Sequence, residues 1–185
     1  MIADVTRDAE SKMQQTIEAT KREFATIRTG RANPAILDNI QVEAYDSRMP
    51  INQLATISAP EPRLLVVSPW DKSVLGAIRN AITTSNLGLN PQSDGNILRI
   101  PLPQLTEERR KELAKMVSRR TEESKVAIRN VRRDAIEDLR KLEKNHEITE
   151  DDLKRAQDQV QKLTDKYIQE VDRLHDAKVA EIMEV

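Results

Sequence analysis

The sequence predicts an α+β protein in which an antiparallel three-helix bundle is interrupted by a small inserted β/α/β domain. Apolar residues recur every three or four positions along three long segments, one at the start of the chain and two at its end, and this spacing is typical of amphipathic helices. After the first segment the period changes to two, and prolines bound the short apolar runs. The charged share of 33% against an apolar share of 38% also favours long, one-sided helices.

The first predicted helix begins at Ile2 and ends before Gly30. Gly30 stands where many helices have a C′ glycine, and Asn33-Pro34 then prevents the helix from resuming. The apolar stripe of this helix consists of Val5, Ala9, Met13, Ile17, Phe24 and Ile27.

Two further helices follow in the second half of the chain. Thr106 is a good N-cap for the first of them, and Asn145 is expected to end it. Thr149, with Asp152 three residues later, resembles a capping box and predicts the start of the last helix. The two stripes consist of Leu113, Val117, Ser124, Ile128, Val131, Ala135, Leu139 and Leu142, and of Leu153, Ala156, Val160, Leu163, Tyr167, Val171, Leu174 and Ile182.

Each of these helices has one apolar stripe that must be buried against other helices. The short connection between the second and third helices predicts that they pack antiparallel, with the first helix in the groove between them. Since every stripe is then used inside one bundle, we expect a monomer.

The middle of the chain is predicted to be a domain with its own core. Strands are expected over residues 40–44, 54–58, 63–68 and 97–100, and Asp71 is expected to cap a short helix before the last of them. We therefore expect a bundle made of residues 1–30 plus 105–185 and an inserted domain over residues 31–104. Both ends of the insert must meet the bundle at one place, so the two connecting strands would form a hinge.

The sequence lacks the residues of most catalytic and metal sites. It has no cysteine, and its two histidines, His146 and His175, are a weak ligand pair. None of the four glycines belongs to a phosphate-binding loop. Carboxylate pairs occur in the first turns of predicted helices, where the helix dipole already explains them. We expect no enzyme, no cofactor and no metal.

The chain also lacks a predicted membrane or export segment. Charged residues near the N-terminus do not fit a signal peptide. The longest aliphatic run, residues 64–67, is far shorter than the roughly 20 residues that a membrane span requires. These observations predict a cytoplasmic protein without membrane contact.

Arginine is the chemical signal that remains. The net charge is −1, yet residues 106–145 hold 13 basic and 9 acidic side chains. Arg129, Arg132 and Arg133 fall at i, i+3 and i+4 and share one side of the second predicted helix. Arginine favours bidentate contact with phosphate. The chain has four aromatic residues, too few for a surface that stacks the bases of a single strand, so the matching ligand is the backbone and shape of folded RNA. The alternative is a solvated face whose arginines pair partly with nearby carboxylates.

Four sequence motifs follow one another over essentially the whole chain. They are Arg28-Thr29-Gly30-Arg31-Ala32, Leu87-Gly88-Leu89-Asn90-Pro91, Pro101-Leu102-Pro103-Gln104-Leu105-Thr106-Glu107-Glu108-Arg109-Arg110 and Arg129-Asn130-Val131-Arg132-Arg133-Asp134-Ala135. In order and spacing these motifs resemble those of the bacterial ribosome recycling factor family. This resemblance implies a three-helix bundle interrupted by a small domain on a flexible hinge, in agreement with the periodicity.

The resemblance also implies a function and the residues that serve it. Members of the family split the post-termination ribosome into subunits together with elongation factor G, which supplies the GTP hydrolysis. The bundle is expected to lie along the RNA of the large ribosomal subunit, while the inserted domain receives the push from the elongation factor. The implied RNA contacts are Arg132, Arg129, Arg133, Arg28, Arg31 and Arg110, and the implied hinge residues are Gly30, Arg31, Pro101, Pro103, Gln104 and Leu105.

Two residues depart from the family pattern. Asp46 stands where the family often has a turn glycine, and Gln104 stands where a second hinge proline is common. The resemblance therefore gives neither the geometry of that turn nor the stiffness of that hinge. The alternatives to a recycling factor are a non-enzymatic coiled-coil adaptor, which predicts no compact insert, and an RNA-binding scaffold.

Overall fold

The computed structural model describes residues 1–184 and has the predicted α+β architecture, three long helices with an inserted β/α/β domain. Its internal contacts form two compact units. The first consists of residues 1–23 and 115–179, and the second of residues 24–114 together with those from 180 onward. The second unit thus contains the insert and the adjoining ends of the long helices. The boundaries predicted for the bundle and the insert, at residues 30 and 105, remain a prediction.

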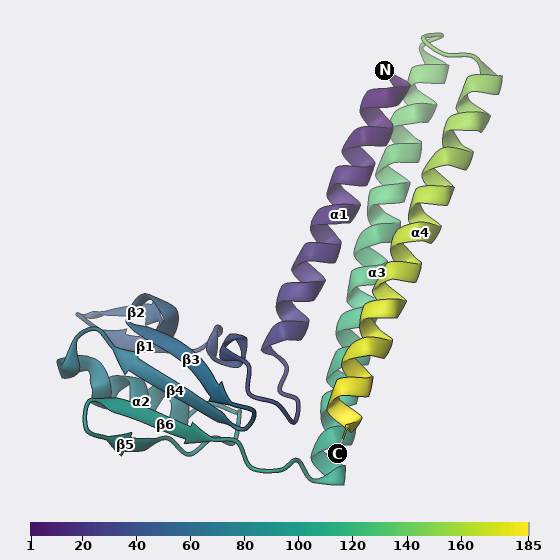
Figure 1. Ribbon diagram of the computed structural model, residues 1–185. Helices are drawn as coiled ribbons and strands as arrows, with labels where there is room; N and C mark the ends of the chain where they lie inside the picture. Colours follow the sequence, from purple (N-terminus) through teal and green to yellow (C-terminus); the bar gives the residue numbers. More distant parts are fainter. Residues whose placement is uncertain (185) are drawn as a thin grey trace. The chain divides into compact units, whose positions relative to one another are not determined.

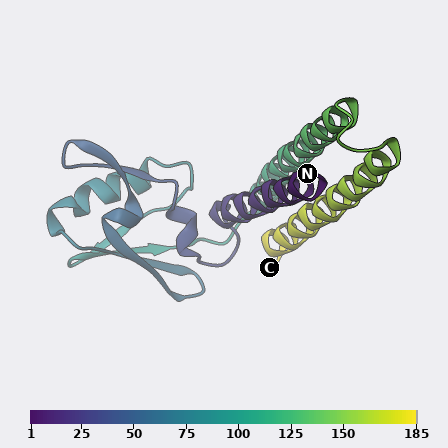
Figure 2. The same cartoon turned by 90° about the horizontal axis from the view of Figure 1, so that it is seen from above.

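The first unit is built from three amphipathic helices, which lie side by side in Figures 1 and 2. They are α1 (Ile2–Thr26), α3 (Glu107–Lys144) and α4 (Glu150–Met183). In one core cluster Ala9 packs with Leu139 and Val160, and in another Ile17 packs with Ile128 and Val171. As residue numbers rise along α1, the numbers of the residues packed against it fall along α3 and rise along α4. Helix α3 is therefore antiparallel to α4, as predicted.

A polar layer interrupts this apolar core. The hydroxyls of Thr20 and Ser124 lie 2.6 Å apart in a buried hydrogen bond that joins α1 to α3. Thr20 also donates to the Thr16 carbonyl oxygen at 2.8 Å. Ser124, a member of the predicted stripe, is thus buried inside the bundle. Unlike the apolar members of that stripe, it contributes through a hydrogen bond.

The helix starts predicted from the sequence are confirmed. The backbone N–H of Arg109 donates to Thr106 Oγ1 at 3.0 Å, which makes Thr106 the N-cap of α3. At the start of α4, Asp152 N–H donates to Thr149 Oγ1 at 3.0 Å and Thr149 N–H donates to Asp152 Oδ2 at 3.2 Å. This reciprocal pair is the capping box.

The first helix ends before Gly30, as predicted, but Gly30 is not its C′ glycine. The helix ends at Thr26, and Gly30 does not have the positive φ of a C′ glycine. Instead, Ile27 N–H donates to the Phe24 carbonyl oxygen at 3.1 Å, which tightens the last turn, and the chain leaves the helix with Arg28 and Thr29 buried. Arg28 makes a long-range contact in this segment, described below, which the local sequence does not show.

The second unit contains two antiparallel sheets and a short helix (Figure 1). Strands β1 (Gln41–Ala44) and β2 (Ser47–Pro50) form a hairpin. A four-stranded sheet has the order β3-β4-β6-β5. Its strands are β3 (Ala55–Glu61), β4 (Leu64–Pro69), β5 (Gln92–Asp94) and β6 (Ile97–Pro101), and the helix is α2 (Leu75–Thr83). Asp71 caps the 3₁₀ turn Lys72–Val74 that directly precedes α2, by accepting a hydrogen bond from Ser73 N–H at 2.9 Å, whereas α2 itself has no side-chain cap.

The core of the insert consists of the alternate strand residues and one face of α2. Val42 on β1, Leu65 and Val67 on β4 and Ile78 and Ile82 on α2 are fully buried in one cluster. Strands β2 and β5 were not predicted, because their residues are mostly exposed and carry no apolar alternation.

The β1–β2 turn has an unusual composition. It consists of Tyr45 and Asp46 at φ 53° and 60°, the two positive values of a type I′ turn, where glycine or asparagine is preferred. The Tyr45 hydroxyl donates a hydrogen bond to the Asp71 carboxylate, and this contact anchors the turn. The bond lowers the pKa of Asp71 and raises that of Tyr45.

Candidate nucleic-acid interface

The arginine triplet lies on α3, next to the residues that this helix buries. Ile128 is fully buried and Val131 is half-buried in the bundle core. Arg129 and Arg133 are exposed beside them, and Arg132 is half-buried. The helix therefore presents the three guanidinium groups at the edge of the packed face, where their backbone is held rigidly.

Arg132 is held by the neighbouring helix. Its Nη1 donates to Gln161 Oε1 on α4 at 3.0 Å, and Gln161 in turn donates to Asp165 at 2.9 Å. The Nε of Arg132 is buried and has no hydrogen-bond partner. This side chain is thus oriented by α4 while part of its donor capacity is unused.

The described residues lack the carboxylate pairing that the alternative of a solvated face expects, although Arg129 and Arg133 are exposed. Among residues 1–184, none of the three arginines forms an ion pair with Asp134 or Glu137. Arg133 donates to the neutral amide oxygen of Asn130 at 2.6 Å. The positive charge of the triplet is therefore left uncompensated by carboxylates, as an anion-binding surface requires.

Arg28, another predicted RNA contact, is buried, with 6% of its surface exposed. Its Nη2 donates to the Pro103 carbonyl oxygen, and this hydrogen bond joins the two chain segments that connect the insert to the helices. Burial lowers the pKa of Arg28, and the nearby charges of Arg109 and Arg63 lower it further. This position favours a role in joining the two connecting segments.

The two chain segments that contain the predicted hinge residues are hydrogen-bonded to the insert, although Pro101, Pro103 and Gln104 are exposed. Ala32 N–H donates to the Pro62 carbonyl oxygen at 2.6 Å, and Leu102 N–H donates to the Arg63 carbonyl oxygen at 2.8 Å. Both connecting segments are thus bonded to the turn between β3 and β4. Leu102 and Leu105 are buried as well.

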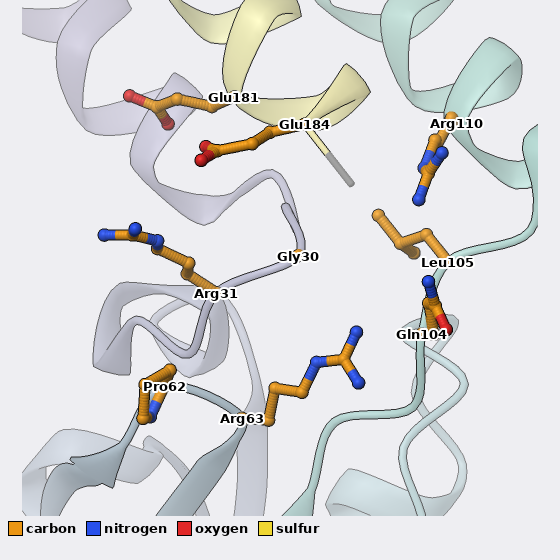
Figure 3. A pocket seen from close by; sticks show the side chains of 9 residues that line it. All are labelled: Gly30, Arg31, Pro62, Arg63, Gln104, Leu105, Arg110, Glu181 and Glu184. Carbon is orange, nitrogen blue, oxygen red and sulfur yellow. The ribbon is translucent and has the colours of Figure 1, made fainter.

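Five of the predicted site residues, Arg110 among them, meet at one cavity of about 240 Å³ in the second unit (Figure 3). Gly30 and Arg31 come from the first connecting segment, and Gln104 and Leu105 come from the second. The remaining lining residues are Pro62, Arg63, Arg110, Glu181 and Glu184. Arg110 was predicted as an RNA contact, whereas Arg63 was missed, because nothing near it in sequence marks it.

A serine, a histidine and an aspartate come together in the first unit. Ser118 Oγ lies 3.0 Å from His175 Nε2, and His175 Nδ1 lies 2.9 Å from Asp176 Oδ1. Both Ser118 and His175 lie inside long helices, where backbone N–H groups donate to carbonyls four residues earlier and cannot form an oxyanion hole. The arrangement therefore joins α3 to α4 without the geometry of a hydrolase.

Residues 1–184 contain no group of three or more histidine, aspartate or glutamate side chains that could hold a metal ion. No helix in this part of the chain is both long and apolar enough to cross a bilayer.

Comparison with known proteins gives one consistent family. The model of the family described as ribosome recycling factor matches residues 20–183. Ribosome-recycling factors of Heliobacterium modesticaldum and Symbiobacterium thermophilum are 57% and 55% identical over 185 residues, which is the full length of both chains in each case. The factor of Clostridioides difficile is 56% identical, also over the full length.

Solved structures agree with these sequence relatives. A solution structure of the ribosome recycling factor matches with a TM-score of 0.74 and 46% identity, covering 100% of this chain and 98% of that one. The second match is a factor from T. thermophilus, described with the E. coli elongation factor G as bound to the E. coli post-termination complex; its TM-score is 0.69, with 46% identity and full coverage of both chains. The chain described here belongs to the ribosome recycling factor family, whose members are non-enzymatic translation factors.

Proposed function

We propose that this protein splits the post-termination ribosome into subunits together with elongation factor G, which hydrolyses the GTP. The observation that carries the proposal is the arginine triplet on α3, whose three guanidinium groups lie beside the buried stripe and form no ion pair with neighbouring carboxylates within residues 1–184. Full-length similarity to ribosome-recycling factors supports the assignment, and so does the related structure described with elongation factor G on the ribosome.

The proposed ligand of the bundle is RNA of the large ribosomal subunit. Rigidly held arginines bind phosphates through charge-assisted, bidentate hydrogen bonds. Arg129 and Arg133 are exposed for such contacts, and the half-buried Arg132 is oriented between them and α4 by its hydrogen bond to Gln161. No cofactor is needed for this role, because the elongation factor would supply the work.

The test is co-sedimentation of the Arg132→Ala variant with large ribosomal subunits over a series of salt concentrations. Loss of one phosphate contact should lower the slope of log K against log salt by about 0.7–0.9. Folding should be spared, because Arg132 lies beside the apolar stripe and its one hydrogen bond within residues 1–184 is to Gln161.

Arg7→Ala is the matched control, because Arg7 is an exposed arginine on α1 whose ion pair with Asp4 is long, at 3.6 Å. It removes the same charge without touching the triplet and should leave the salt slope unchanged. If Arg132→Ala binds large subunits as tightly as the unchanged chain at every salt concentration, Arg132 has a structural role and does not contact the RNA.

A further inference from the structure

The cavity at the connecting segments has a positive side and a mixed side. In Figure 3 the guanidinium groups of Arg63 and Arg110 are directed toward Gln104 and Leu105. The side chains of Arg31, Glu181 and Glu184 extend toward the opposite side. All nine lining residues belong to the second unit, so the cavity lies inside one compact body.

The two guanidinium groups on the positive side have unused donors. The Nε of Arg110 is buried and has no hydrogen-bond partner. Within residues 1–184 neither Arg63 nor Arg110 forms a side-chain hydrogen bond or an ion pair. A buried donor without a partner costs free energy, and each such group in a folded protein calls for an explanation, such as a ligand.

A third guanidinium group adds to the positive charge of this region. Arg28 is buried, its Nε has no partner, and Arg63 and Arg109 lie close enough to lower its pKa. Arg109 is paired with Glu112 at 2.9 Å, whereas the exposed Arg63, the half-buried Arg110 and the buried Arg28 form no ion pair within residues 1–184. Like charges that lie close together repel one another, and an anion between them removes this repulsion. The side of the cavity near Gln104 is therefore suited to an oxyanion.

We propose that this side of the cavity binds a phosphate group, held by Arg63 and Arg110 with the amide of Gln104 as a further donor. Phosphate presents several acceptor oxygens around one centre, which matches donors that approach from different elements. A cavity of about 240 Å³ has room for one phosphate and its neighbouring atoms. The phosphate can be a free ion or a phosphate group of RNA. The RNA source rests on the proposed function.

The proposed site has a mechanical consequence for the hinge. Arg63 lies in the turn between β3 and β4 of the insert, and Arg110 lies in the first turn of α3. Gln104 lies in the segment that connects β6 of the insert to α3. A phosphate bound to Arg63 and Arg110 would connect the insert to the helix across this segment. Binding would therefore restrict the second connecting segment.

The experiment is a titration of the full chain with inorganic phosphate at constant ionic strength, followed by ¹H–¹⁵N NMR spectra, with chloride as the reference anion. The proposal predicts saturable shifts of the Gly30, Gln104, Leu105 and Arg110 amides. Arg63→Gln should raise the Kd for phosphate about tenfold or more, because a charge-assisted hydrogen-bond pair is lost. Arg48→Gln, which removes an exposed arginine elsewhere in the insert, should leave the Kd unchanged.

The same spectra show whether each variant is folded. If Arg63→Gln disturbs amides beyond the cavity, Arg110→Gln carries the test with the same expected loss. Phosphate shifts that do not gather at the cavity, or that persist at the same Kd without Arg63 and Arg110, would overturn the proposal.

Binding to large ribosomal subunits distinguishes the source of the phosphate. If the ligand is an RNA phosphate, Arg63→Gln lowers the salt slope of subunit binding by about 0.7–0.9. If the ligand is a free ion, the slope is unchanged while the effect on the phosphate titration remains. A failure of Arg132→Ala to weaken subunit binding would count against the proposed function and would leave the phosphate site intact.

Discussion

At the scale of single residues, the unused arginine donors are the most informative feature of the molecule. Within residues 1–184, the buried side-chain nitrogens and oxygens that lack a hydrogen-bond partner are the Nε atoms of Arg28, Arg110 and Arg132. All three arginines were predicted as RNA contacts from the resemblance. The structure thus places unused hydrogen-bonding capacity where an anionic ligand is expected.

Only some of the candidate RNA-binding and cavity residues could be predicted from the sequence. The triplet on α3 follows from helical spacing, because i, i+3 and i+4 share one side of any helix. The burial of Arg28 and the approach of Arg63 to Arg110 depend on contacts between residues dozens of positions apart, and no local pattern encodes them.

The β1–β2 turn gives a prediction about stability. Asp46→Gly should raise the free energy of unfolding of the insert by about 0.5–1 kcal/mol, because glycine adopts φ near +60° without the steric cost that Asp46 has there. Urea unfolding followed by the fluorescence of Trp70, which lies in the insert, measures this change. Asp46→Ala is the control and should not raise the free energy of unfolding, because alanine is not favoured at positive φ. Equal effects of the two variants would show that the positive φ of residue 46 is not the cause.

At the scale of elements, the hydrogen bond between Thr20 and Ser124 predicts an asymmetric response to mutation. Thr20→Val leaves the buried Ser124 hydroxyl without its partner and should cost about 1–3 kcal/mol. Ser124→Ala should cost less, about 1 kcal/mol, because Thr20 keeps its bond to the Thr16 carbonyl oxygen. Urea unfolding followed by circular dichroism gives both values.

The double variant completes this test. Thr20→Val combined with Ser124→Ala removes both hydroxyls, so its cost should be smaller than the sum of the two single costs. Strict additivity would mean that the two hydroxyls do not interact in solution.

The capping box of α4 predicts a dependence on pH. The pKa of Asp152 is lowered first by the backbone N–H of Thr149, then by the side chains of Arg155 and Thr149. A lowered pKa in the folded state stabilises the fold above the unfolded value of about 3.9, and this contribution is lost as the pH falls through the folded value. Asp152→Ala should therefore unfold with a weaker pH dependence below about pH 4 than the parent, and an unchanged dependence would exclude Asp152 as a contributor.

The elements themselves were predicted where a periodic pattern exists. The helix starts at Thr106 and Thr149 follow from local capping chemistry, and strands β1, β3, β4 and β6 follow from alternation or short apolar runs. Strands β2 and β5 lack such patterns because their side chains are mostly exposed, and pairing with a neighbouring strand determines their conformation. The hydrogen bond from Arg28, just after α1, to the distant carbonyl of Pro103 likewise has no local signal in the sequence.

At the scale of the whole molecule, the bundle and the insert are proposed to have different tasks. The insert has its own apolar core, and the long helices have theirs. We propose that the bundle binds RNA and that the insert transmits the push of elongation factor G through the two connecting segments, which resist torsion better than one would. A helical rod bound to RNA gains no directional force by itself.

A chain without the insert separates these tasks. Residues 31–105 are deleted and Gly30 is joined to Thr106, which leaves the three apolar stripes and the arginine triplet in place. We expect this chain to fold and to bind large subunits through Arg129, Arg132 and Arg133. Circular dichroism and co-sedimentation check both expectations before activity is measured.

The most direct measurement is light scattering of post-termination ribosomes mixed with elongation factor G, GTP and either the full chain or the chain without the insert. The account predicts a fall in scattering, as ribosomes split into subunits, with the full chain, and no fall with the shortened chain even where it is bound. Undiminished splitting by the shortened chain would contradict the claim that the insert transmits the push.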